Sequence, residues 1–173
     1  MLVFLFLFVA FTVSAWQYPE TYPSSIPKSF AISSLILLCS SFVLQKAKHF
    51  FESEDERSLR KHLALALALG STFCGFQFIG WIELQQAGSF LDSSAVEGYL
   101  YVLSGLHMAH LAGGMVFLGA VFWKVSSLKG DPVQSLLYFT DPYQKLRLRI
   151  LGIYWHFMDA LWLVLFIYFL LWL

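Results

Sequence analysis

The chain has 173 residues, of which 58% are apolar, 18% aromatic and only 13% charged. Soluble domains carry about 25% charged residues, so this composition and a mean hydropathy of +0.67 exclude an ordinary soluble enzyme. Eleven basic residues balance eleven acidic ones, and no basic stripe is available to neutralise nucleic-acid phosphates. The apolar runs are continuous rather than alternating, which excludes a transmembrane barrel. The composition therefore predicts an all-α, polytopic transmembrane helical bundle.

Five apolar segments follow one another along the chain, and we expect five transmembrane spans in a single domain covering residues 1–173. The segments are residues 1–16, 29–44, 63–84, 98–123 and 150–173. The last three are long enough to cross a hydrocarbon layer of about 30 Å. The second segment is shorter, and snorkelling of Lys46 and Lys48 at its end would extend it.

The first segment, residues 1–16, allows two interpretations. It ends in Val13-Ser14-Ala15, which resembles the small-residue cleavage site of a secretory signal. The segment lacks the positively charged start that such signals carry. We therefore favour a retained first helix over a cleaved signal.

The basic residues predict an orientation. Ten of the eleven lie in two loops, residues 45–62 and 124–149, which are separated by two crossings. The positive-inside rule places both loops in the cytoplasm or matrix, with the N-terminus inside and the C-terminus outside. The second of these loops contains two Asp-Pro dipeptides, which we interpret as turn signals. Tryptophans near the span ends agree with this placement, namely Trp16, Trp81, Trp123 and Trp172.

Four ionisable residues lie inside the predicted spans, where charged groups are costly and mark functional candidates. They are His107, His110, His156 and Asp159. Each span contributes two of them at a spacing of three residues, so each pair shares a helix face. At about 1.5 Å per residue, His110 and Asp159 both fall near the midplane of antiparallel spans. This placement predicts an intramembrane polar network between the last two spans.

Three roles remain open for these four residues. We favour structural hydrogen bonding over proton handling, and over a metal or a haem held between His110 and His156. Dicarboxylate metal bundles use Glu-x-x-His on two helices, and the chain has no such motif. Cys39 and Cys74 form no CxxC pair. We therefore expect no catalytic, cofactor-binding or metal-binding residue in this chain.

Other residues in the spans are candidates for contacts with lipid, with other subunits or between helices. The candidates for lipid or subunit contact are Gln77, Trp81, Glu83, Trp155 and Trp162. A second set consists of small residues four positions apart, which form a smooth face that lets another helix approach closely. Its members are Gly105, Ala109 and Gly113.

Three stretches resemble subunit III of the haem-copper oxidases. The sequence YWHFMDALW at 154–162 resembles the family's final helix, Tyr-Trp-His-Phe-x-Asp-x-x-Trp. The stretch 101–114, with its His-x-x-His pattern, resembles the penultimate helix, and 75–81 is similar to the glutamine-bearing helix before it. The resemblance covers residues 28–173. The first span departs from it, because residues 1–19 contain no acidic residue where members commonly carry a membrane-embedded glutamate.

The resemblance implies the short, five-helix bacterial type of this family. Such a protein is a non-catalytic accessory subunit of a proton-pumping respiratory terminal oxidase, as in cytochrome c oxidase of the aa3 type. It carries no haem or copper, which are expected in oxidase subunits I and II. It stabilises the catalytic subunit, binds structural phospholipids and supports proton uptake in the bacterial inner membrane.

The resemblance also implies further partners, a small subunit IV or a larger respiratory supercomplex, and no nucleic acid. Two alternative functions stay open from the sequence. The first is subunit III of a quinol oxidase or a relative associated with nitric oxide reductase. The second is an independent haem-binding membrane protein.

Overall fold

The computed structural model describes residues 2–17, 28–88, 95–128 and 131–172. Across these ranges the regular structure is entirely helical, which confirms the predicted all-α class. The helices are α1 (Leu2–Gln17), α2 (Lys28–Glu52), α3 (Glu56–Gln86), α4 (Ala95–Ser127), α5 (Pro132–Thr140) and α6 (Pro142–Trp172).

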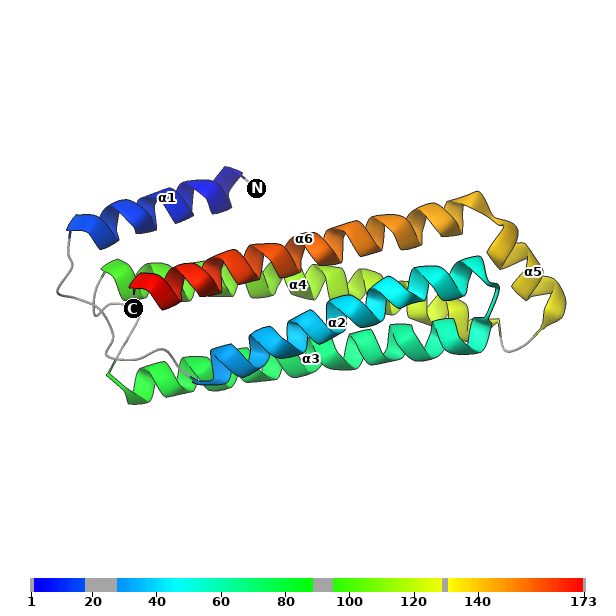
Figure 1. Ribbon diagram of the computed structural model, residues 1–173, viewed down its shortest axis with the longest axis horizontal. Helices are drawn as coiled ribbons and strands as arrows, with labels where there is room; N and C mark the ends of the chain where they lie inside the picture. Colours follow the sequence, from blue (N-terminus) through cyan, green and yellow to red (C-terminus); the bar gives the residue numbers. More distant parts are fainter. Residues whose placement is uncertain (1, 18–27, 89–94, 129–130, 173) are drawn as a thin grey trace.

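Four long helices run side by side with alternating direction (Figure 1). Helix α2 packs on α3, α3 on α4, α4 on α6 and α6 on α2, so the four helices close into a ring. Helix α1 packs on α4 near the end of the bundle that carries the end of α6, and the short α5 lies at the opposite end. A bundle of this kind is expected of consecutive antiparallel helices joined by short connections.

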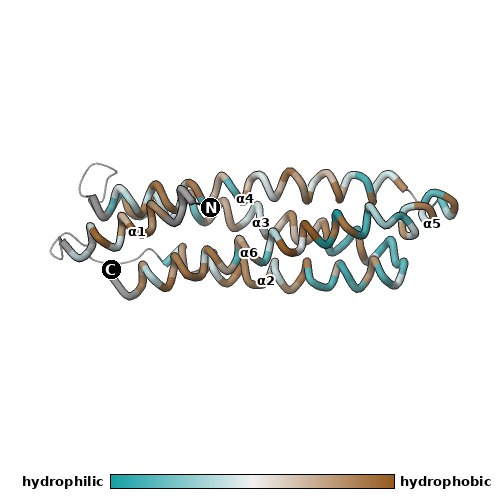
Figure 2. The backbone as a smooth tube through the Cα atoms, turned by 90° about the horizontal axis from the view of Figure 1, so that it is seen from above, coloured by the Kyte–Doolittle hydropathy of each residue, from teal (hydrophilic) through white to brown (hydrophobic). Residues whose placement is uncertain are grey.

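Within the part of the chain that the structure describes, four helices are long and apolar enough to cross a membrane: α2, α3, residues Glu97–Ser127 of α4 and residues Pro142–Leu170 of α6. Helix α1 has 16 residues, fewer than the ~20 that a typical span needs. The four long helices extend several residues beyond the predicted segments, because their polar ends continue the helix past the apolar stretch. Figure 2 shows this pattern as hydrophobic middles and hydrophilic ends near α5.

The predicted loop 124–149 contains helix α5, which the sequence interpretation missed. Both Asp-Pro dipeptides that we interpreted as turn signals stand at helix starts. Asp131 accepts hydrogen bonds from the backbone of Val133 and Gln134 as the N-cap of α5. Proline at the first helical position is favourable, because the first turn has no intrahelical partner for its N–H. The same dipeptide is therefore compatible with a turn and with a helix N-terminus.

A tight connection joins α2 to α3, and α5 covers it. Glu54 adopts a positive φ of 56°, and Asp55 caps α3 by accepting a hydrogen bond from the Ser58 backbone at 3.1 Å. Hydrogen bonding to Ser58 holds the pKa of the Asp55 carboxyl below its usual value. Phe51 packs edge-on against Tyr138 of α5 at 5.8 Å between ring centroids. Burial there raises the pKa of Tyr138 to about 12.

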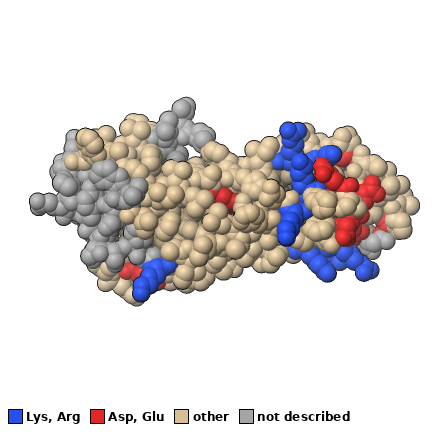
Figure 3. All heavy atoms as spheres, in the orientation of Figure 1, with Lys and Arg blue, Asp and Glu red and all other residues tan. Residues whose placement is uncertain are grey.

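The surface separates into a mainly uncharged stretch, which we call the uncharged band, and a charged end. Figure 3 shows most of the Lys, Arg, Asp and Glu gathered around the end that carries α5, with a wide band beside it in which other residues predominate. A small acidic spot lies within that band, and a few charged atoms lie toward the opposite end. Large apolar side chains point outward from the long helices, including Phe42, Val116 and Trp123, which is 77% exposed. Apolar surface of this extent is expected to face lipid rather than water.

Candidate functional site

Helices α2 and α6 are joined by a row of hydroxyl–ring hydrogen bonds, which we call the serine seam. Its pairs are Trp162 Nε1 donating to Ser34 Oγ at 2.9 Å, Trp155 Nε1 donating to Ser40 Oγ at 3.0 Å, and Ser41 Oγ with His156 Nδ1 at 2.6 Å. Both tryptophans are 0% exposed. Their indole N–H groups are therefore satisfied inside the bundle, away from water.

The spacing of the tryptophans and of their acceptor serines explains the two indole hydrogen bonds of the seam. Trp155 and Trp162 lie seven positions apart on α6, and their acceptors Ser40 and Ser34 lie six positions apart on α2. Seven positions are close to two helical turns, so the two tryptophans share one face of α6, and both serines are buried opposite them. The two helices run in opposite directions, so the later tryptophan, Trp162, meets the earlier serine, Ser34. A buried indole N–H is a donor only and needs an acceptor.

Asp159 of α6 lies next to the serine seam and is buried. The side chain is 4% exposed, and the Ser41 hydroxyl lies near its carboxyl group. Among the residues that the structure describes, neither carboxyl oxygen makes a hydrogen bond. Ser41, His156 and Asp159 thus form a small polar cluster between α2 and α6, at a depth where polar groups are costly.

The two histidines of α4 have different surroundings. His107 is 1% exposed and lies between the Phe73 ring at 5.9 Å and the Trp162 ring at 5.0 Å. Within the described ranges, its ring nitrogens have no hydrogen-bond partner. His110 is exposed, and its Nδ1 lies 2.8 Å from the Leu106 carbonyl oxygen of its own helix.

The structure therefore does not form the predicted hydrogen-bonded network between the last two spans. Asp159 and His156 face α2, whereas His107 faces the aromatic core and His110 faces outward. The hydrogen bond between α4 and α6 at this depth instead runs from the Tyr154 hydroxyl to the His110 backbone carbonyl, at 2.7 Å. The rotation of α6 about its axis points the Asp159 carboxyl group toward α2 rather than toward α4.

Three of the five candidates for lipid or subunit contact are instead buried within the bundle. Trp155 and Trp162 belong to the serine seam, and Gln77, which is 1% exposed, donates to Ser33 Oγ at 3.4 Å. The other two are partly exposed. Trp81 Nε1 donates to Ser104 Oγ at 3.1 Å, and Glu83 accepts a hydrogen bond from Ser29. Their polar atoms thus connect neighbouring helices of the same chain.

The predicted small-residue face of α4 does not contact another helix closely. Ala109 and Gly113 are exposed, and a Cβ at Gly113 would meet no atom within 4 Å. At Gly105, a Cβ would stand 3.8 Å from the Trp81 ring. The close approaches occur at other glycines, because large rings pack over them. These positions are Gly70 under Trp155, Gly80 under Phe30 and Gly114 under Tyr154.

Sequence reasoning missed the serines of α2, although their signal was present. Serines recur six to seven positions apart in one span and tryptophans seven positions apart in another, a pattern that indicates two matching helix faces. We found no metal-binding arrangement among the described residues, where no three His, Cys, Asp or Glu side chains are grouped to hold an ion.

A ring of apolar helices, with polar side chains paired mainly across helix contacts, defines a multi-pass membrane protein of the α-helical class. The family model described as cytochrome c oxidase subunit III matches residues 1–173. The chain therefore belongs to the cytochrome c oxidase subunit III family. Membership makes it a membrane subunit of a haem-copper oxidase complex of the respiratory chain.

Curated relatives agree with this assignment. The chain is 27% identical to cytochrome c oxidase subunit 3 of Synechocystis sp., over 95% of this chain and 67% of the relative. It is 29% identical to cytochrome c oxidase subunit 3 of Thermostichus vulcanus, over 78% of this chain and 61% of the relative. It is 27% identical to a probable cytochrome c oxidase subunit 3 of Nocardia farcinica, over 95% of this chain and 76% of the relative. The matches thus span about two thirds of the relatives' length.

Proposed function

We propose that this chain is the non-catalytic accessory subunit III of a proton-pumping terminal oxidase, cytochrome c oxidase of the aa3 type. The observation that carries the proposal is the family match along residues 1–173. The proposal includes five transmembrane spans in a bacterial inner membrane, with the N-terminus inside and the C-terminus outside. The pairing of buried polar groups between helices supports a structural role for the spans.

In this proposal, the partner subunits carry out the oxidase reaction. Haem and copper are held by subunits I and II, and this chain stabilises the catalytic subunit, binds phospholipid and supports proton uptake. The outward-facing apolar side chains of the uncharged band support such contacts, since they fit a partner helix or lipid chains equally well. A small subunit IV and a larger supercomplex are further proposed partners.

Affinity purification of the tagged chain from mild detergent tests the proposal. We expect oxidase subunits I and II to co-purify, and the haem spectrum to follow subunit I when the subunits are separated. A dinuclear copper motif in the recovered subunit II identifies cytochrome c rather than quinol as donor. Recovery of the chain alone with one haem bound would contradict the proposal and favour an independent haem protein.

The proposed orientation predicts which helix connections are accessible from outside the cell. Ser53 lies at the α2–α3 connection, on the charged end, and Ala87 lies just after α3 at the opposite end; both are exposed. In a chain whose Cys39 and Cys74 are replaced by alanine, a membrane-impermeant thiol reagent should modify Ala87→Cys but not Ser53→Cys. Permeabilised cells, in which both positions should react, provide the control. The reverse pattern in intact cells would contradict the orientation.

A structural role for the polar cluster predicts a small effect of Asp159→Asn. The amide keeps the size of the side chain, and hydrogen bonds within membranes contribute only about 0.6 kcal/mol on average. We expect subunit retention, oxygen turnover and proton pumping to stay close to those of the unsubstituted complex. Subunit ratios and the protons released per electron in vesicles provide the measurements. Loss of pumping in a fully assembled complex would assign Asp159 to a proton path instead.

A further inference from the structure

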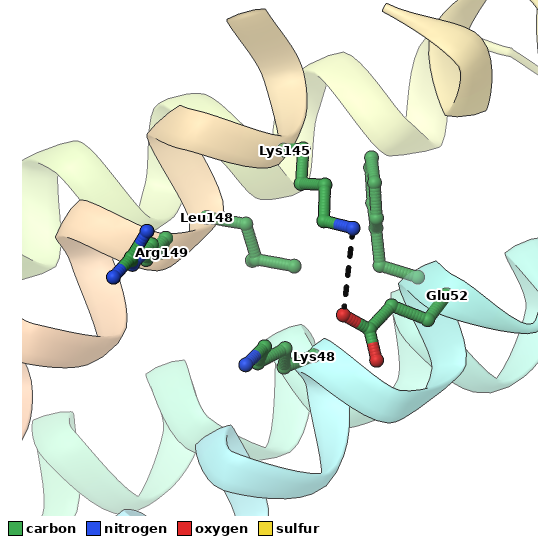
Figure 4. A pocket seen from close by; sticks show the side chains of 6 residues that line it. Lys48, Glu52, Lys145, Leu148 and Arg149 are labelled. Atoms are coloured by element: carbon green, nitrogen blue, oxygen red, sulfur yellow. Dashed lines mark ion pairs between the residues drawn. The ribbon is translucent and has the colours of Figure 1, made fainter. Parts of the chain in front are cut away.

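A pocket of about 360 Å³ opens between α2 and α6 near the charged end of the bundle. It is lined by Lys48, Phe51, Glu52, Lys145, Leu148 and Arg149. Figure 4 shows the side chains of the two helices facing one another, with Lys48 and Glu52 on α2 and the other labelled residues on α6. The volume lies in the range of pockets that hold small ligands.

The lining carries an excess of positive charge. Lys145 Nζ lies 3.6 Å from Glu52 Oε1, and both side chains remain largely exposed at 62% and 45%. An exposed pair of this kind is weak and easily rearranged. Lys48 and Arg149 take part in no ion pair with any other described residue. One carboxylate thus faces three cations, which leaves two positive charges for a ligand.

The pocket lies where the apolar part of the helices ends. The last apolar run of the chain begins at Ile150, directly after Arg149, and the apolar run of α2 ends at Leu44, one turn before Lys48. Cationic side chains at this level stand among lipid headgroups. The buried Phe51 and Leu148 supply an apolar floor at 3% and 7% exposure.

The pocket side of α6 stays open toward the membrane. Gly152 lies one turn further into the apolar run than Arg149, and a Cβ there would meet no atom within 4 Å. A ligand with a phosphate at the cations and an acyl chain beside Gly152 therefore has space for both parts. A free phosphate ion would occupy only the space beside the cations.

We propose that Lys48, Lys145 and Arg149 bind the phosphate of an anionic phospholipid, such as phosphatidylglycerol, at the inner face of the membrane. Basic pockets between transmembrane helices on this side suit anionic headgroups, and the guanidinium of Arg149 matches phosphate geometry. The proposal rests on the membrane orientation proposed above but not on the oxidase role.

Native mass spectrometry of the complex, released from nanodiscs with equal phosphatidylglycerol and phosphatidylethanolamine, tests the site. The unsubstituted complex should retain phosphatidylglycerol selectively. The double variant Lys48→Gln/Arg149→Gln should lose it by about tenfold or more, since each basic residue near the surface contributes roughly fivefold in affinity.

The matched control is Lys46→Gln/Arg147→Gln, which removes the same charge from the same two helices. Neither residue lines the pocket, and the Arg147 guanidinium lies 5.4 Å from the Tyr143 ring centroid instead. The control should retain the lipid. An equal loss in both variants would overturn the proposal in favour of general surface charge, and unchanged retention in both would also overturn it.

Two further outcomes distinguish other ligands. Displacement of phosphatidylglycerol by millimolar inorganic phosphate would identify a free-phosphate site and overturn the lipid assignment. Loss of a partner subunit from Lys48→Gln/Arg149→Gln, with lipid retained, would overturn it in favour of an acidic protein segment. A chain that purifies without oxidase subunits would contradict the proposed function, whereas the lipid measurement on that full chain would still test the pocket.

Discussion

Gly80→Val is expected to destabilise the bundle by about 3 kcal/mol, the upper part of the range for overpacked cores. Gly80 is buried on α3, and the Phe30 ring of α2 lies so close that no Cβ fits beside it. Phe30 is 1% exposed and packs edge-on against Trp162, with ring centroids 6.0 Å apart. The ring therefore cannot move aside without disturbing the serine seam.

The matched control for this prediction is Gly75→Val on the same helix. A Cβ at Gly75 would meet no atom within 4 Å, so this variant carries only the change in intrinsic helix propensity from glycine to valine, which both variants share. Unfolding of the purified protein in increasing SDS, followed by circular dichroism, provides the measurement. Phe30→Ala should relieve Gly80→Val in a double-mutant cycle. Equal stability of the two glycine variants would contradict the packing that we describe.

Trp162→Ala should destabilise the protein by about 3 kcal/mol, the low end of the range for buried aromatic truncations in soluble cores. We use the low end because separated membrane helices expose their side chains to lipid rather than to water, so burying the ring gains less free energy than in a soluble protein. The indole ring contacts Phe30, Phe73 and His107 and donates to Ser34. Its removal leaves a cavity at the meeting point of α2, α3, α4 and α6.

Two further tryptophan variants separate the contributions to this effect. Trp123→Ala, at a ring that is 77% exposed, should change stability little in the same SDS assay. Trp162→Phe keeps an aromatic ring but removes the N–H donor. Its loss of stability should therefore fall between those of Trp123→Ala and Trp162→Ala. A Trp123→Ala loss as large as that of Trp162→Ala would contradict the location of the core.

The sequence alone determined the class of protein and much of its layout. Long apolar runs require helices, because a backbone in lipid must satisfy its own hydrogen bonds. The loops 45–62 and 124–149 carry most of the basic residues, and the structure places the ends of α2 and α6 from these loops on the two sides of one pocket. The resemblance to subunit III, drawn from stretches such as residues 154–162, is confirmed by the family match over residues 1–173.

Only the tertiary structure decided which polar groups meet. Hydropathy gives the depth of a residue, whereas its partner depends on the rotation of each helix about its axis. Asp159 and His110 lie at similar depth, yet packing of Trp155 and Trp162 against α2 turns the Asp159 face toward Ser41. The sequence likewise does not show which glycine lies beneath a large side chain of another helix. Gly113 and Gly80 look alike in sequence, but only Gly80 has a large ring above it, and that ring comes from a helix fifty residues away in the chain.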